Sequence, residues 1–449
     1  MEIASVVDEG LGNSAHVVDL GDGGALVVDP ERDPRPYLTE VDRRELVPRL
    51  VVETHLHADF VSGGREIAAV GARLLAPSGA DLGYAHRALR GGDEVDLGGL
   101  TLRVIATPGH TPEHLAYLLA DGSRPVALFS GGALMTGGVA RPDLLSPEQT
   151  EPLARAAHRS VIRRLFTLPD DLPVYPTHGA GSFCASAPGG TRTTTIGRER
   201  TTNPLFADGA DEDTFIARLL GGLGSYPPYF LELRDVNRAG PRVYGPQPPA
   251  LPQLSLDEVD TVAADGAQLV DVRAIDRFAA GHVPGALSNP WRPQFATWLG
   301  WLVPRDQPVV FVADDTVDRA DLVWAAYTVG YERLAGELTG GIDAWQAGDR
   351  DLSRTRLVGP EGADGRQIVD IRQRNEFAAG HAPGALHVEL GSLTETPDAV
   401  PDVPVLLHCS HGERAMSAAS LLEKTGHRDL AVLAGSPRDL AELETAPRA

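Results

Sequence analysis

Three segments of the sequence carry histidine directly after a short apolar run. The first, residues 54–60 (THLHADF), contributes His55, His57 and Asp59, and two later loops contribute His110 and His178. Imidazoles and a carboxylate at this spacing can converge on one point just past the ends of strands. A single histidine of this kind is more often a satisfied polar residue than a ligand, but three such loops together favour a metal site.

A cysteine lies between another apolar run and a helix-like stretch near the C-terminus. Residues 405–407 (VLL) lead into the loop 408–414 (HCSHGER), and a helical pattern follows over residues 415–424. A thiol at a helix start faces free backbone N–H groups and the positive end of the helix dipole, which favour a thiolate or a persulfide. Gly412 lets the loop curl, and Arg414 adds a fixed cation. We predict Cys409 and Arg414 as catalytic residues, and the substrate-binding residues as Ser410, His411, Gly412 and Glu413.

An internal repeat positions this cysteine loop. Residues 270–287 and 369–386 are identical at 12 of 18 positions, at an offset of 99 residues. In each copy a second strand-like run follows, and then a loop and a helical stretch. The C-terminal part of the chain is therefore predicted to be two copies of one α/β module.

The chain length and the Pro-rich segment that interrupts its periodic patterns predict three domains. Short β-rich runs alternate with turns and helical stretches up to residue 244, and a Pro-rich segment without periodicity follows. We assign residues 1–244 to the first domain, 245–256 to a linker, 257–352 to the first repeat copy and 357–449 to the second. At 449 residues the chain is long enough for three cores.

Composition excludes several classes of protein and partner. Apolar residues make up 42% of the chain and charged residues 23%, which is typical of a folded protein. The formal charge of -22 disfavours nucleic acid and anionic membranes as partners. The two cysteines, no basic-apolar leader and no long apolar run favour a cytoplasmic protein. Whether it forms a homo-oligomer stays open.

The histidine segments resemble the metallo-β-lactamase superfamily, whose signature is His-x-His-x-Asp-His followed by further ligands at later strand ends. Within that superfamily the chain is most similar to persulfide dioxygenases fused to rhodanese modules. The resemblance implies an αββα sandwich for residues 1–244, followed by two rhodanese-like α/β domains. It also implies a mononuclear Fe(II), held by two His and one Asp, which activates O₂ to oxidise a low-molecular-weight thiol persulfide to sulfite.

Two positions depart from the family pattern. Phe60 replaces the last histidine of the signature, which is a ligand of the second metal in dinuclear hydrolases. Gly132 stands where the family's Ser-Gly-Asp pattern places the carboxylate ligand, so only His55 and His110 remain of the implied iron triad. Ala140, in the segment GGVAR, also differs from the expected GDVGR. Clustered losses of this kind predict an impaired site.

Three interpretations of the first domain remain open at this stage. The site could be an iron dioxygenase with altered ligation, a metal-poor or inactive site, or a zinc hydrolase of the hydroxyacylglutathione type that uses His55, His57 and His110. Phe60 and Gly132 both count against the hydrolase. A non-catalytic scaffold that binds or senses persulfides is a further alternative.

The spacing Cys-x4-Arg resembles rhodanese sulfurtransferases, in which the cysteine carries sulfur as an enzyme persulfide. In the first copy Ala313 stands in the place of the nucleophile and Asp318 in that of the arginine, so we predict that this copy is not catalytic. The other cysteine, Cys184, is predicted to be a small buried residue. The predicted function is thiol-persulfide metabolism with sulfur transfer at Cys409, from a thiol persulfide or thiosulfate, beside an impaired dioxygenase-like domain.

Overall fold

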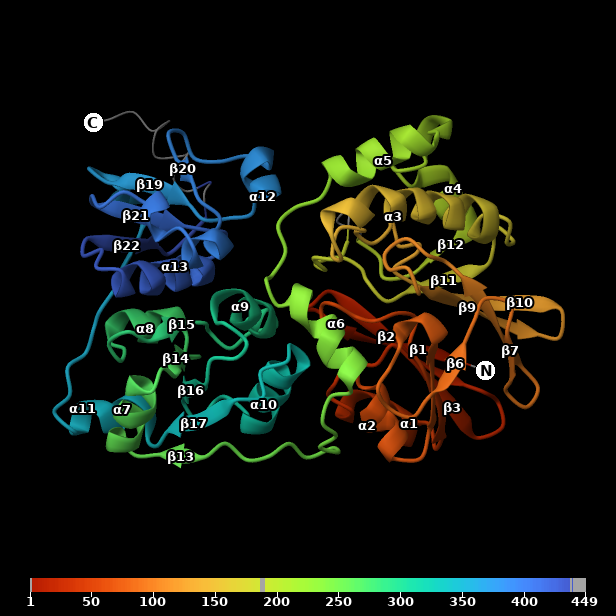
Figure 1. Cartoon of the computed structure of the whole chain (residues 1–449). Coiled ribbons are helices and arrows are strands. Elements are labelled where there is room, and N and C mark those ends of the chain that lie inside the picture. The colour runs from red at the N-terminus through yellow and green to blue at the C-terminus, as the bar shows by residue number, and fades with distance from the viewer. Residues whose placement is uncertain (1, 186–189, 437, 439–449) are drawn as a thin grey trace. The chain divides into compact units, whose positions relative to one another are not determined.

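The computed structural model describes residues 2–185, 190–436 and 438 (Figure 1). The chain divides into two compact units, residues 1–248 with 324–330, and residues 249–323 with 331–449. The end of the predicted second copy, residues 439–449, lies outside the described residues. None of the described helices is both long and apolar enough to span a bilayer.

The first unit contains two six-stranded sheets. The first has the strand order β1-β2-β3-β4-β5-β6 and the second β12-β11-β10-β9-β8-β7. The strands of the first sheet are β1 (Ile3–Asp8), β2 (Asn13–Asp19), β3 (Gly24–Val28), β4 (Val47–Val52), β5 (Arg73–Pro77) and β6 (Arg87–Leu89). Those of the second are β7 (Glu94–Asp96), β8 (Thr101–Ala106), β9 (Leu115–Asp121), β10 (Arg124–Gly131), β11 (Pro173–Pro176) and β12 (Thr194–Thr195).

Three hydrophobic clusters show how these sheets are layered. One cluster joins the facing sides of the two sheets and includes Leu26, Val52, Tyr117 and Phe129. A second joins the outer side of the first sheet to α1 (Arg35–Arg43) and α2 (Gly64–Ala69). A third joins the second sheet to α3 (Pro147–Ser160), α4 (Ile196–Thr202) and α5 (Glu212–Gly221). Helix, sheet, sheet and helix layers therefore follow in that order, which confirms the αββα sandwich.

The second unit contains two parallel five-stranded sheets with the same topology. Their strand orders are β13-β17-β16-β14-β15 and β18-β22-β21-β19-β20. The first sheet consists of β13 (Gln253–Leu254), β14 (Gln268–Asp271), β15 (Leu287–Ser288), β16 (Val309–Val312) and β17 (Leu334–Leu338). The second consists of β18 (Arg356–Val358), β19 (Gln367–Asp370), β20 (Leu386–His387), β21 (Val405–His408) and β22 (Leu430–Leu433). The repeat in the sequence is thus a repeat of the fold.

Helices follow the strands of these sheets, as expected for parallel connections. They are α7 (Leu256–Ala264), α8 (Ile275–Ala280), α9 (Phe295–Leu302), α10 (Arg319–Thr328), α11 (Gly341–Ala347), α12 (Arg374–Ala379) and α13 (Glu413–Lys424). Ser255 caps α7 in a capping box with Glu258. Two residues of the predicted linker, Gln253 and Leu254, pair with β17 as the edge strand β13, so the ordered sheet begins earlier in the chain than the periodicity indicates.

Candidate functional site

The five predicted metal ligands lie together at the ends of strands in the first unit. His55, His57 and Asp59 follow β4, His110 follows β8 and His178 follows β11. All five residues are buried. Candidate ligand atoms of His55, His110 and His178 lie within 4.8 Å of one another, and so do those of His57, Asp59 and His178. Loops that are distant in the sequence therefore converge at one edge of the sandwich.

Hydrogen bonds orient the imidazoles in this cluster. Thr54 Oγ1 lies 2.8 Å from His55 Nδ1, and the carbonyl of Arg141 lies 2.6 Å from His110 Nδ1. Each contact leaves the other ring nitrogen to face the cluster. His55 Nε2 lies 3.4 Å from His178 Nε2. In metal-binding histidines, a hydrogen bond to the ring nitrogen that faces away from the metal fixes the ring orientation and the tautomer.

The cluster also contains polar atoms that protein groups leave unsatisfied. His57 Nδ1, Asp59 Oδ1 and His110 Nε2 are buried and have no hydrogen-bond partner among the residues that the structure describes. Burial lowers the pKa of His55 and His110 well below the ordinary value, and the neighbouring histidines add to the shift. Neutral imidazoles with free lone pairs are what a metal ion requires, so these residues fit a metal such as iron or zinc.

The other ring nitrogen of His57 contacts two carboxylates. Its Nε2 lies 3.2 Å from Glu53 Oε2 and 3.3 Å from Asp29 Oδ1. Burial opposes a charge on this ring, but the two carboxylates raise the pKa of His57 to about 10. Asp29 also accepts hydrogen bonds from the backbone N–H and side chain of Thr54. Neither Asp29 nor Glu53 is among the predicted site residues, although both stand at the end of an apolar strand.

The two departures from the family pattern have visible structural consequences. Phe60 is fully buried and its ring stacks on His57, with 4.1 Å between centroids. The backbone N–H of Gly132 donates to His114 Nε2 at 3.0 Å. A Cβ atom at Gly132 would lie only 2.7 Å from the Cβ of Ala140. Ala140 therefore occupies the space that a carboxylate side chain at position 132 would need.

Cys409 directly follows β21, and the loop of residues 409–412 leads from it into α13, in the second unit. The residue is only 1% exposed, and its Sγ accepts a hydrogen bond from the backbone N–H of Gly412 at 3.1 Å. Gly412 has φ = 100°, a left-handed conformation that favours glycine. The loop therefore directs a backbone donor at the sulfur atom, as the strand-loop-helix pattern predicts.

Arg414 is held beside Cys409 by a carboxylate that sequence analysis did not find. Its Nη1 and Nη2 donate to the two carboxylate oxygens of Glu376, at 2.6 and 2.8 Å, and Nη2 also donates to Ser410 Oγ at 3.2 Å. Of the other loop residues, His411 is exposed and Glu413 begins α13. Glu376 belongs to α12, and only the tertiary fold brings it to this loop.

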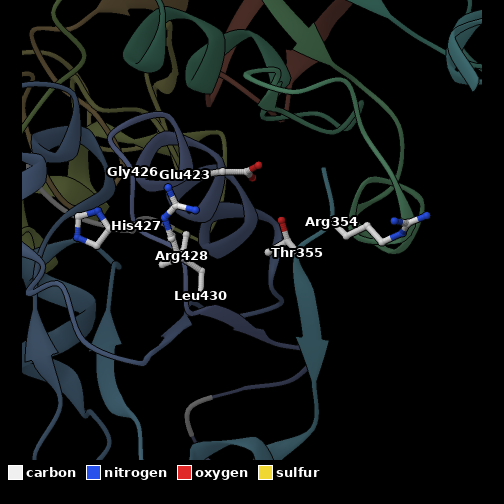
Figure 2. Close-up of a pocket in the computed structure, with 7 residues that line it drawn as sticks. All are labelled: Arg354, Thr355, Glu423, Gly426, His427, Arg428 and Leu430. Carbon is white, nitrogen blue, oxygen red and sulfur yellow. The ribbon is translucent and has the colours of Figure 1, made fainter. Parts of the chain in front are cut away.

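Two further features are a hollow in the second unit and the other cysteine, Cys184. Figure 2 shows a hollow of about 380 Å³. Its lining residues are Arg354, Thr355, Glu423, Gly426, His427, Arg428 and Leu430. Those between 423 and 428 come from the C-terminal end of α13 and the turn after it, whereas Cys409 precedes the N-terminal end of that helix. Cys184 is fully buried, and burial raises the pKa of its thiol well above the ordinary value. A buried neutral thiol fits the structural role predicted for Cys184.

Comparisons with known proteins agree with both halves of this description. The rhodanese-like domain family matches residues 255–348 and 355–441. The mitochondrial persulfide dioxygenase of Homo sapiens is 30% identical over 215 residues, which cover 45% of this chain and 74% of that protein. A hydroxyacylglutathione hydrolase of Methylobacillus flagellatus is 36% identical over 159 residues, 35% of this chain and 58% of that enzyme.

A solved structure extends the match through most of the chain. The metallo-β-lactamase of Staphylococcus aureus superposes with a TM-score of 0.66 at 29% sequence identity. The alignment covers 75% of this chain and 99% of that one. These matches confirm the metallo-β-lactamase fold of the first unit and the rhodanese-like domains that follow it.

Proposed function

The chain belongs to the persulfide dioxygenase family, and from this premise we propose that it transfers sulfane sulfur through Cys409 in the metabolism of thiol persulfides. The observation that carries the proposal is the geometry of the Cys409 loop. The Gly412 N–H donates to Cys409 Sγ at 3.1 Å, and Arg414, which forms an ion pair with Glu376, interacts with Cys409. These groups stabilise a negative sulfur atom before and after transfer.

The transfer is a displacement at sulfur that keeps atoms and charge balanced. The Cys409 thiolate attacks the outer sulfur of a thiol persulfide or of thiosulfate, and the S–S bond of the donor breaks. The donor leaves as a thiolate or as sulfite, and Cys409 becomes a persulfide anion. An acceptor thiolate then attacks the outer sulfur, takes it away as its own persulfide and restores the Cys409 thiolate.

Substitution of the nucleophile tests this proposal. Cys409→Ser should abolish sulfur transfer from both thiosulfate and a thiol persulfide, whereas Cys184→Ser should keep the activity because Cys184 is buried in another unit. A persulfide adduct of 32 Da should appear on Cys409 by mass spectrometry after donor treatment. Full activity of Cys409→Ser would show that the nucleophile is assigned wrongly.

For the first unit we propose a metal held by imidazoles and a dioxygenase activity that is impaired. His55, His110 and His178 would hold the ion, with His57 and Asp59 adjacent, and a bound metal would supply Lewis acidity or, as Fe(II), a site for O₂. The second position of a dinuclear hydrolase lacks its histidine because Phe60 fills that space. The unpartnered atoms of the cluster support metal binding, and Gly132 supports the impairment.

Restoring the carboxylate tests the impairment. Gly132→Asp combined with Ala140→Gly should bind about one iron per chain and consume O₂ when a thiol persulfide is added, because the second change opens the space for the new side chain. Gly132→Asp alone should bind less iron, and Ala140→Gly alone is the matched control. Stoichiometric iron together with persulfide-dependent O₂ uptake in the unmodified protein would contradict the proposal.

A further inference from the structure

The first repeat copy is bonded to the helix that follows the Cys409 loop. Ser417 Oγ of α13 donates to the carbonyl of Ser288 at 2.6 Å, and the Ser288 N–H donates to Ser420 Oγ at 3.1 Å. Ser288 ends β15 of the first copy, and α13 lies beside β15 (Figure 1). The residues after β15 are thereby held close to the cysteine of the other copy.

Side chains of the first copy contact the Cys409 loop itself. The Trp298 ring of α9 lies 5.9 Å from the guanidinium carbon of Arg414. A Cβ at Gly412 would lie 2.9 Å from Ile275 Cδ1, so Ile275 packs against the turn that presents the backbone donor to Cys409. The copy that lacks a nucleophile therefore forms part of the surroundings of the nucleophile in the other.

Arg292 of the first copy adds a positive charge to the surroundings of the Cys409 loop. It follows β15 and interacts electrostatically with Cys409, Glu413 and Arg414. Its Nη1 donates to Gln294 Oε1 at 3.0 Å, and its buried Nε has no hydrogen-bond partner in the described part of the chain. Burial lowers the pKa of Arg292, but a guanidinium remains protonated at neutral pH. Arg292 thus keeps a buried donor, Nε, that no described protein group satisfies, four residues after the Ser288 segment that is bonded to α13.

The two arginines near Cys409 differ in their partners. Arg414 donates to both carboxylate oxygens of Glu376, so its charge is largely neutralised. Within the described part of the chain, Arg292 makes no ion pair with a carboxylate. An anion that approaches Cys409 therefore meets one cation that is already paired, Arg414, and one that is available, Arg292.

We propose that Arg292 binds the negatively charged part of the sulfur donor and so selects anionic donors at Cys409. The inference rests on the proposed sulfur transfer and adds its substrate class. Such a donor carries a negative charge on its leaving group, in addition to any charge on the two sulfur atoms of the bond that breaks. Sulfite leaving from thiosulfate has this property, and so does a thiolate that carries a carboxylate. The loop residues alone favour a thiol persulfide, whereas Arg292 admits both donors.

Alkylation of Cys409 tests the charge preference without any assay of sulfur transfer. Iodoacetate and iodoacetamide differ in charge, and the ratio of their rates at Cys409 is read by peptide mass spectrometry on the full chain. Arg292→Gln should lower the iodoacetate-to-iodoacetamide ratio by about tenfold, as expected for loss of a hydrogen bond to a charged group. Arg292→Lys should retain most of the ratio. Arg428→Gln removes a cation at the opposite end of α13 and should leave the ratio unchanged (Figure 2).

Steady-state kinetics then separate the two anionic sources. Arg292→Gln should raise KM for thiosulfate and for a carboxylate-bearing persulfide, with a much smaller effect on KM for a neutral alkyl persulfide. An effect confined to thiosulfate or to the carboxylate-bearing persulfide would identify the donor that Arg292 serves.

An unchanged alkylation ratio, equal losses with charged and neutral donors, or no reaction of Cys409 with either reagent would each overturn the inference. Its failure is distinct from failure of the proposed function. Cys409→Ser decides the proposed function, because an inactive Cys409→Ser variant beside an unaffected Arg292→Gln variant would reject only the role of Arg292.

Discussion

The two rhodanese-like copies share a scaffold and differ in one loop. Their sheets have the same strand order, and in each an arginine two residues after a buried aspartate returns to bind it. Arg273 Nε lies 2.9 Å from Asp271 Oδ1, and Arg372 Nε lies 2.9 Å from Asp370 Oδ1. These pairs hold the strand end and the following turn in both copies, so their conservation within the chain needs no catalytic explanation.

The loop after the central strand of each sheet, β16 or β21, carries the difference. In the second copy the backbone donor of Gly412 points at Cys409. In the first copy Ala313 lines an open hollow of about 620 Å³, where Arg277 pairs with Asp314 at 2.7 Å and Arg319 pairs with Glu337. In this hollow, carboxylates neutralise the two arginines that could otherwise bind an anionic sulfur donor. A shared scaffold therefore preserves the fold, whereas reactivity depends on a few residues in one loop.

Moving the thiol to the other copy is the strongest test of this comparison. The double variant Ala313→Cys, Cys409→Ser should show sulfur transfer lower by about a thousandfold or more, because a thiol without an available cation does not replace the lost nucleophile. Activity is measured by sulfite release from thiosulfate. Substantial activity of this variant would show that the loops are equivalent.

Breaking the shared pairs should give similar losses in both copies. Asp271→Asn and Asp370→Asn each leave a buried arginine without its counter-charge, which should lower the free energy of unfolding by about 3–5 kcal/mol. Chemical denaturation measures the change, and Asp276→Asn on α8 serves as a control. A large loss in only one copy would show that the two scaffolds differ more than their geometry indicates.

Acid should weaken the Cys409 loop by breaking the ion pair between Glu376 and Arg414. Burial raises the pKa of Glu376, but its ion pair with Arg414 outweighs this and holds the pKa below the ordinary value of 4.5. The pair is therefore intact above pH 4.5 and is lost as pH falls through the lowered pKa. Glu376→Gln should reduce kcat/KM by about threefold at pH 7. It should also remove this part of the acid sensitivity, which pH profiles of kcat/KM would detect.

Much of the architecture follows from the sequence because its signals are local. The repeat at an offset of 99 residues predicts two equal modules, and strand-loop-helix punctuation places Cys409 at a helix start. The order of the histidine loops predicts a convergent cluster, and the resemblance to the metallo-β-lactamase superfamily implies the αββα fold. Edge details are less well predicted, because β13 is stabilised by pairing with β17, a partner more than 80 residues away.

The partners of the predicted site residues depend on tertiary structure. Cys409, Arg414 and the five metal-cluster residues can be proposed from their types and spacing, since each stands in a short loop directly after an apolar strand. Glu376, Asp29 and Arg292 carry no such motif, and burial and distant packing give them their role. The sequence determined which groups could react, and the fold decided which charges neutralise them, since electrostatic pairing depends on distance in space rather than along the chain.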